Sequence, residues 1–178
     1  FLLIILITFS YSSSLAQEQF NFDVTEIEIY EKGNKFRGLK RGKISTANGI
    51  TLDADKFEYN KISNILDASG NVIINDFVNK VTILSSDITY LKNDEIIFTN
   101  SKSTAIYDNI VIDANGFKYN KKLNILNAKG NVRIEDKNKN IIILSEDITH
   151  YIEEQKFVSK SKSEAFDQNL NIKADEFE

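Results

Sequence analysis

Apolar and polar residues alternate along most of this chain. From Ile50 to Phe98 the apolar side chains fall at every second position within short segments, and polar residues separate one segment from the next. Such alternation is typical of β-strands with one buried face, because successive side chains of a strand point to opposite sides. After the opening residues no segment shows the three-and-four spacing of a helix. The pattern predicts an all-β protein of repeated antiparallel strands, each about 5 to 9 residues long and joined by short turns.

A segment of 60 residues occurs twice. When residues 49–108 are aligned without gaps to residues 109–168, 26 of the 60 positions are identical, and a third copy begins at residue 169. ILDASGNVIIND at Ile65 returns as ILNAKGNVRIED at Ile125. Repeats of this length are typical of folds that grow by stacking similar units. We expect one domain over residues 17–178, with units at 49–108 and 109–168 and a third unit that the end of the sequence interrupts.

Within a unit the inward-facing side chains change from even-numbered to odd-numbered positions, as from Ile74 to Ile83. We call this a change of parity. Such a change requires an extra residue or a turn, as at a β-bulge or at a corner where a strand leaves one sheet for another. Gly70 and Gly130 suit such corners, because glycine adopts backbone angles that a side chain forbids. Short strands that turn corners at a fixed period predict two facing sheets, hence a β-jelly-roll or β-solenoid that is open at both ends.

The opening residues 1–9 form an uncharged apolar run, which gives way to a small and polar stretch ending in Ser14, Leu15 and Ala16. This arrangement predicts a secretory signal peptide over residues 1–16, cut after Ala16. Its start is expected to be missing, because the chain does not begin with Met. A membrane anchor is the alternative, but about 20 apolar residues are needed to span a bilayer.

Composition narrows the classes of function. The 178 residues contain no Cys, one His and a net charge of −4, which excludes disulfides and thiolate chemistry and nearly excludes zinc sites built from Cys and His. Basic residues are scattered among acidic ones except in LKRGK at 39–43, which we interpret as a solvated turn. Nucleic acid is therefore not an expected partner.

Candidate chemistry is sparse. His150 occupies the position that Tyr90 holds one unit earlier, so we interpret it as a structural ring rather than a catalytic base. Asp53 and Asp55 resemble calcium ligands, but the second unit replaces one acid with Asn115 and the distal Glu of a calcium loop is missing. We therefore expect no catalytic residue, no metal site and no cofactor, and we expect that the chain is not an enzyme.

The apolar interior has two interpretations. In the first, the inward side chains fill the space between the sheets, as core residues do; in the first unit these are Ile50, Leu52, Phe57, Leu66, Val72, Ile74, Ile83 and Ile88. In the second, the sheets splay apart and leave a continuous slot for acyl chains, whose exposure to water costs about 0.8 kcal/mol per CH2. The residues expected to contact such chains are Phe57, Ile74, Ile83, Phe117, Ile134 and Ile143.

Three motifs carry a family resemblance. They are D-A-D-x-F-x-Y at 53–59, L-x-A-x-G-N-V-x-I at 66–74 and S-x-D-I-x-Y at 85–90, and the pattern repeats from residue 113. These motifs resemble the OstA-like periplasmic domains of the lipopolysaccharide transport machinery. The resemblance implies a β-jelly-roll that stacks edge to edge with other such domains across the periplasm of a Gram-negative bacterium. It also implies that lipid A acyl chains of lipopolysaccharide lie in the interior.

Three relatives share this domain: a soluble bridge protein, a membrane-anchored adaptor beside the inner-membrane transporter, and an outer-membrane assembly protein in which the jelly-roll precedes a barrel. A cleaved signal counts against the adaptor. Direct passage from the signal into an expected strand at 22–30 is most like the assembly protein, with the bridge a close second. The expected partners are then other jelly-roll domains paired through edge strands, a C-terminal barrel outside this sequence and its lipoprotein plug, at the outer membrane.

Two other classes of protein share some of these features. A secreted β-repeat surface or adhesive protein would bind through its exposed faces and have a fully packed interior without lipid cargo. A carbohydrate-active β-solenoid enzyme would need a cluster of carboxylates on one outer face, whereas the acids here are spread among the turns.

Overall fold

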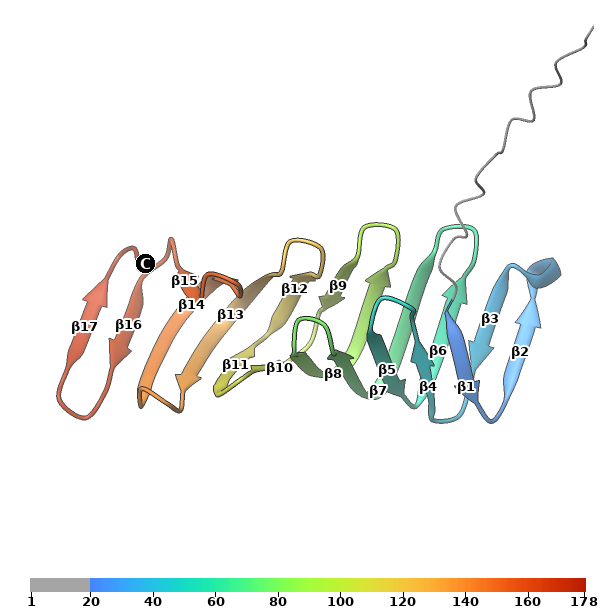
Figure 1. The fold of residues 1–178 in the computed structure, drawn as a ribbon, viewed down its shortest axis with the longest axis horizontal. Helices are drawn as coiled ribbons and strands as arrows, with labels where there is room; N and C mark the ends of the chain where they lie inside the picture. The colour runs from blue at the N-terminus through green and yellow to red at the C-terminus, as the bar shows by residue number, and fades with distance from the viewer. Residues whose placement is uncertain (1–19) are drawn as a thin grey trace, which may run out of the picture.

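The computed structural model describes residues 20–178, and the predicted signal peptide at 1–16 lies outside them. The described chain consists of antiparallel strands and one short 3₁₀ segment, η1 (Glu31–Gly33), which confirms the all-β prediction. Figure 1 shows the strands side by side along the long axis, with β17 at the end opposite to β1 and β2. The strands are β1 (Asn21–Val24), β2 (Ile27–Tyr30), β3 (Lys35–Gly38), β4 (Gly42–Ser45), β5 (Ile50–Ala54), β6 (Lys56–Asn60), β7 (Ile65–Asp76), β8 (Val81–Leu91), β9 (Ile96–Thr99), β10 (Ser103–Tyr107), β11 (Ile110–Ala114), β12 (Gly116–Asn120), β13 (Ile125–Asp136), β14 (Ile141–Tyr151), β15 (Lys156–Val158), β16 (Ser163–Phe166) and β17 (Asn171–Ala174).

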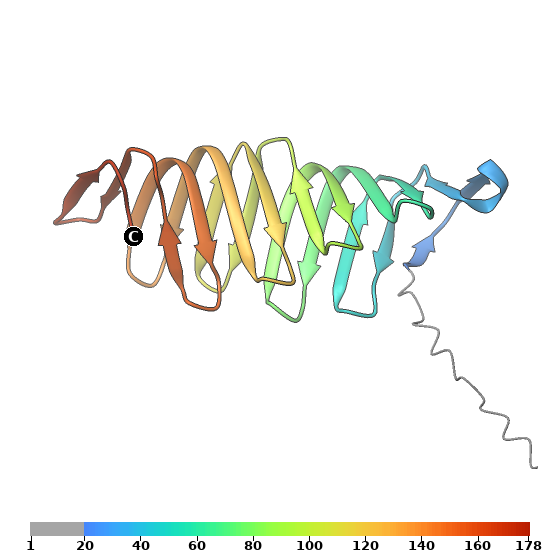
Figure 2. The same cartoon turned by 90° about the horizontal axis from the view of Figure 1, so that it is seen from above.

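The strands form one hydrogen-bonded sheet that folds along its middle into two walls. The first wall contains β1, β4, β5, β10, β11, β16 and β17, and the second contains β2, β3, β6, β9, β12 and β15. The long strands β7, β8, β13 and β14 contribute one half to each wall; β7, for example, pairs with β6 over its first half and with β5 over its second. In Figure 2 these long strands pass from one wall to the other. The middles of the long strands therefore form the fold line between the two walls of the jelly-roll.

A bulge marks this fold line in each pair of long strands. The register of β7 against β8 shifts between Ser69 and Val72, and β13 against β14 shows the same shift one unit later. Gly70 has a φ of 79° and Gly130 a φ of 75°, in the left-handed region that glycine tolerates. Both glycines lie at corners of the fold, as expected. The buried side chains keep the same parity across Gly70 in β7, and the parity changes instead in the partner strand β8, between Ile83 and Ile88.

The prediction of a single strand at 22–30 is wrong, because two separate strands, β1 and β2, occupy this segment. β1 pairs with β4 in the first wall, β2 pairs with β3 in the second, and Thr25 and Glu26 lie between them. The chain passes from one wall to the other at this point, so its two halves need different partners. Glu26 Oε2 lies 2.8 Å from Nζ of Lys40, which follows β3.

The inward faces of both walls form one hydrophobic cluster. The eight inward residues predicted for the first unit all belong to it, and none is more than 3% exposed. Their counterparts one unit later are also buried, except that Ile110, the counterpart of Ile50, is partly exposed. No helix in the described part of the chain is long and apolar enough to cross a membrane.

Candidate functional site

The inward face of the first wall is apolar from one end to the other. The strand register places one apolar side chain beside the next at a single level of the wall. A hydrocarbon chain lying along this row would meet only apolar side chains. The first-wall row consists of Phe22, Ile44, Leu52, Ile74, Ile83, Ala105, Ile112, Ile134, Ile143, Ala165 and Ile172.

The second wall carries a matching row that is richer in rings. Its members also follow one another in register, and all of them except Ile29 and His150 pack in the same hydrophobic cluster as most of the first-wall row. We name the space between the two rows the slot. The second-wall row consists of Ile29, Phe36, Tyr59, Leu66, Tyr90, Ile97, Tyr119, Leu126, His150 and Phe157.

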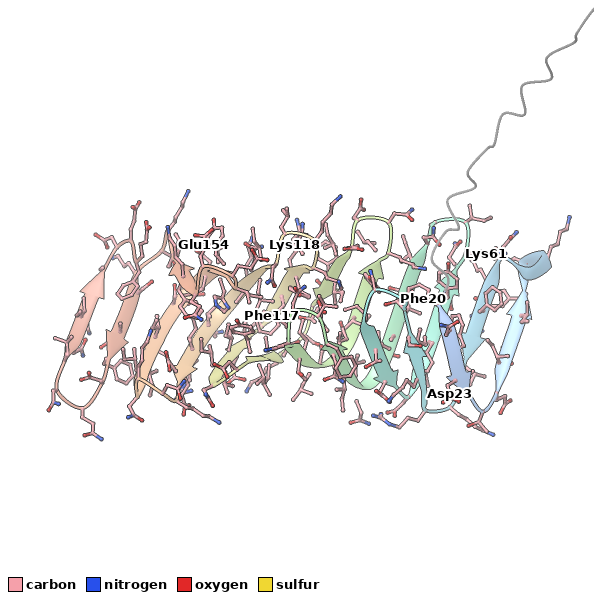
Figure 3. All side chains as sticks on the ribbon, viewed as in Figure 1. Phe20, Asp23, Lys61, Phe117, Lys118 and Glu154 are labelled. Carbon is pink, nitrogen blue, oxygen red and sulfur yellow. The ribbon has the colours of Figure 1, made fainter. Side chains whose placement is uncertain are left out.

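The structure places all the predicted contact residues on inward faces. In each unit the two isoleucines lie opposite each other in the first-wall row, and the phenylalanine lies on the second wall opposite an alanine of a long strand. Their exposed fractions range from 1% to 8%, so they are packed side chains, and contact with an acyl chain stays a prediction. These residues are Phe57, Ile74, Ile83, Phe117, Ile134 and Ile143; Phe117 lies in the middle of the body in Figure 3.

Inward-facing apolar side chains become exposed at both ends of the described body. Ile29, which begins the second-wall row on β2, is 60% exposed, and Ile27 beside it is 39% exposed. At the other end Ile172, the last member of the first-wall row, is 42% exposed.

An aromatic cluster fills the slot near β1, and the sequence analysis missed it. The Phe20 ring lies 4.9 Å from the Tyr59 ring, and Phe22 stacks on Phe36 at 6.0 Å between centroids. Phe20 is only 7% exposed, although it precedes β1 (Figure 3). The alternation of Phe20 and Phe22 was the available signal, but it adjoins the predicted signal peptide.

Hydrogen bonds join the two walls along the side opposite the fold line. Tyr119 of the second wall donates its hydroxyl to Asp76 Oδ2 at 2.8 Å, and Asn79 Nδ2 donates to the Tyr119 oxygen at 3.0 Å. Asn48 Nδ2 donates to Glu95 Oε1 at 2.8 Å. Burial, and then the Asp76 carboxylate, raise the pKa of Tyr119, so its hydroxyl stays protonated and donates. We name these contacts the cross-wall bonds.

His150 packs as a ring within the slot. It stacks on Phe157 with 4.2 Å between ring centroids and meets Tyr107 edge-on at 5.8 Å. Burial lowers its pKa to about 4, so the imidazole is neutral at neutral pH. Within the described residues neither ring nitrogen has a hydrogen-bond partner. The ring therefore lacks the oriented carboxylate or nucleophile that a catalytic histidine needs.

The acids considered as calcium ligands have structural partners instead. Asp55 accepts hydrogen bonds from Asn71 Nδ2 at 2.7 Å and Arg41 at 3.0 Å, and these bonds lower the pKa of its carboxyl group. Asp53 Oδ2 lies 3.9 Å from Lys43 Nζ. With Lys40 bound to Glu26, all three basic residues of 39–43 thus pair with acids, and Lys43 lies in β4 rather than in a turn. Among the described residues no group of three or more His, Asp or Glu side chains could hold a metal ion.

Comparison with known proteins agrees with this architecture. Residues 13–137 match the family model described as "Lipopolysaccharide-assembly, LptC-related". Among solved structures, the chain is similar to LptH from Pseudomonas aeruginosa, described as the LptA homologous periplasmic component of a lipopolysaccharide transport device. The TM-score is 0.57 at 11% identity, over 63% of this chain and 82% of that one, a likeness that shows the fold alone. No curated protein gives a significant match. The chain therefore belongs to the LptC-related family of lipopolysaccharide-assembly proteins, and it is a component of lipopolysaccharide transport with an LptA-like β-jelly-roll fold.

Proposed function

We propose that this protein is a periplasmic carrier segment that shields lipid A acyl chains in the slot and passes them toward the outer membrane. The observation that carries the proposal is the first-wall row, which is apolar at every position along the described body. Because each CH2 exposed to water costs about 0.8 kcal/mol, a covered path is what a lipid with several chains needs. Such a role requires burial rather than chemistry, so we infer that the protein acts without catalysis.

Open strand edges support stacking with other jelly-roll domains. Within the described residues β1 and β2 pair on one side only, β1 with β4 and β2 with β3. Unpaired backbone groups on such edges are suited to pairing with a strand of another domain. A neighbour that adds strands to both walls would extend the slot past Ile29 or Ile172. The partners in this proposal are therefore lipopolysaccharide and adjacent jelly-roll domains of the transport bridge.

The position within the machinery is the finer part of the proposal. The sequence favours the N-terminal periplasmic part of the outer-membrane assembly protein, which would bring a C-terminal barrel and its lipoprotein plug as partners. The LptC-related match adds weight to the membrane-anchored adaptor, for which the apolar residues 1–9 would belong to an anchor. N-terminal sequencing of the full-length protein from fractionated cells distinguishes them: a mature start near Gln17 excludes the adaptor, and an uncleaved inner-membrane protein excludes the assembly protein and the bridge.

The test of lipid carriage uses neighbouring positions on opposite faces of β8. A photo-crosslinking residue is placed at Ile83, which faces the slot, or at Thr82, which faces away, in the full-length protein in cells. Adducts with lipopolysaccharide at Ile83 and none at Thr82 are expected. If the folded, secreted protein captured lipid at neither position, the interior would be ordinary core and a structural or adhesive surface protein would be the better assignment.

A further inference from the structure

Hairpin turns of both walls meet on the side opposite the fold line. Across the slot, Asn48 Nδ2 donates to Glu95 at 2.8 Å, and Asn79 Nδ2 donates to the Lys121 carbonyl at 3.3 Å. Neighbouring turns of one wall are joined by bonds from a backbone N–H to a carbonyl: Phe77 to Gly49, Lys92 to Asn64 and Lys121 to Glu95. These bonds link the turns at 46–49, 61–64, 77–80, 92–95 and 121–124 into one continuous surface, which we name the turn surface.

The turn surface lies within the body rather than at one of its ends. Its turns connect strands from β4 to β13, and described strands continue both walls on either side of it. In Figure 1 the turns that follow β6, β8 and β12 lie along the upper edge, where Figure 3 labels Lys61. The exposure of this surface is thus a property of the body itself.

Large apolar side chains at these turns are exposed to water. Ile62 is 74% exposed, Phe77 and Val78 are each 66% exposed, and Leu123 is 62% exposed. Between β3 and β16 no other described large apolar side chain is more than 44% exposed. The turns themselves do not require apolar residues, because the second unit has Lys and Asn at the positions of Phe77 and Val78. Apolar side chains gathered on one exposed surface indicate an interaction site.

The same turns carry an excess of positive charge, although the whole chain has a net charge of −4. They contain two acidic residues, Asp94 and Glu95, and five lysines: Lys61, Lys80, Lys92, Lys121 and Lys122. Within residues 20–178 no ion pair involves any of these lysines other than Lys92, whereas the basic residues of 39–43 all pair with acids. Four ammonium groups therefore remain for an anionic partner.

Lysines beside exposed apolar side chains are typical of surfaces that lie on anionic bilayers, where the ammonium groups attract lipid phosphates and the apolar groups enter the boundary between headgroups and acyl chains. A soluble anion would need only the lysines and would leave Phe77 and Val78 in water. We propose that the turn surface docks the protein on an anionic phospholipid bilayer. The cross-wall bonds close the slot beneath this surface, so the docking is independent of lipid carriage in the slot.

Photo-crosslinking in cells tests the docking. A photo-crosslinking residue is placed singly at Val78, at Leu123 or, as a control, at Leu39, which is 44% exposed near the fold line. Mass spectrometry identifies the adducts of the full-length protein, and glycerophospholipid adducts at Val78 and Leu123 are expected to exceed those at Leu39 five-fold or more. Equal phospholipid adducts at the three positions overturn the proposal, as do adducts of protein or lipopolysaccharide without phospholipid at Val78. Ile83 reports lipid carriage separately, so the two proposals fail independently.

Charge reversal provides a second readout. Lys61→Glu with Lys122→Glu is expected to reduce phospholipid adducts at Val78 at least three-fold, because repulsion replaces attraction to the lipid phosphates. The matched control is Lys102→Glu with Lys129→Glu, since both lysines are exposed near the fold line on the opposite side, and it should leave the signal unchanged. If the two double variants had the same effect at Val78, the turn surface would not determine membrane contact and the proposal would fail.

Discussion

The ring of His150 shows how a single residue acquires its properties from its place in the slot. It occupies the second-wall row where Tyr90 stands one unit earlier, and aromatic rings surround it. Removal from water disfavours the charged imidazolium, which is why its pKa falls to about 4. A titratable group therefore behaves as a hydrophobic one, and the protein becomes sensitive to acid at this position.

The pKa shift of His150 predicts the direction in which the free energy of unfolding changes with pH. The pKa of this imidazole is about 6.5 in an unfolded chain and about 4 in the folded protein. Below pH 6.5 the unfolded chain binds a proton that the folded protein does not, so the free energy of unfolding decreases as the pH falls, until about pH 4. At pH 5 the loss attributable to His150 is about 2 kcal/mol relative to pH 7.

Urea denaturation of the wild type and of His150→Phe at pH 7 and pH 5 measures this loss. The aromatic replacement keeps the stacking partner of Phe157 but cannot bind a proton. We expect the variant to lose about 2 kcal/mol less stability than the wild type between the two pH values. An identical pH dependence in both proteins would mean that His150 is solvated or paired in solution.

At the fold line a glycine is constrained in two ways. Gly70 has a φ of 79°, and a Cβ added there would lie 2.6 Å from Asp55 Oδ2. Gly33 provides a matched control, because its φ is 88° but an added Cβ would have no neighbour within 4 Å. Gly33→Ala is expected to cost about 1 kcal/mol through backbone strain alone. Gly70→Ala should cost at least twice as much in chemical denaturation, and equal costs would show that Asp55 moves aside freely.

At the scale of strands, the sequence predicts most of the architecture. The period-two pattern indicates the strands, and the change of parity within each unit together with Gly70 indicates the corners, because these are local consequences of side-chain direction and backbone freedom. The cross-wall bonds could not be predicted, since Tyr119 and Asp76 are 43 residues apart and each also fits an ordinary strand or turn. The inward side of the predicted contact residues was likewise predictable, because it follows from the same alternation.

The Tyr119 hydroxyl is expected to stabilise the contact between the walls. Tyr119→Phe removes the donor to Asp76 and leaves this buried carboxylate short of one hydrogen bond, which costs about 1 to 3 kcal/mol. Hydrogen exchange at residues 77–80 should accelerate, because their loop loses its bonds to the Tyr119 hydroxyl and keeps the longer bond from Asn79 to the Lys121 carbonyl at 3.3 Å. The control is Tyr59→Phe, which removes a bond to Asn64 within the second wall only.

Tyr59→Phe should lower stability without changing exchange at 77–80. If instead both variants accelerated exchange in that loop to the same extent, the effect would reflect general destabilisation. The cross-wall role of Tyr119 would then have to be abandoned.

Over the whole molecule, continuity is the property that distinguishes a path for lipid from a packed core. Every strand of the first wall contributes one apolar side chain to the same row, and Ala105 is its smallest member between the two units. An acyl chain can move along a row built from so many strands only if no side chain of the row blocks it. Ala105 carries a single methyl group, so a larger side chain there adds bulk to the row without removing a large core side chain.

We expect Ala105→Trp to obstruct the slot between the units while the protein still folds, because an oversized apolar side chain in a core typically costs about 1 to 3 kcal/mol. Photo-crosslinking residues at Ile74 and Ile134 report lipopolysaccharide on either side of the obstruction, and the wild type should form adducts at both. In the variant, adducts should persist at whichever of these positions lies on the side from which lipid enters, and fall several-fold at the other. The matched control is Ile106→Trp on the outward face, which should change neither signal. If Ala105→Trp left adducts at Ile74 and Ile134 both intact in a folded protein, the units would load independently, and lipid would not pass along a continuous slot.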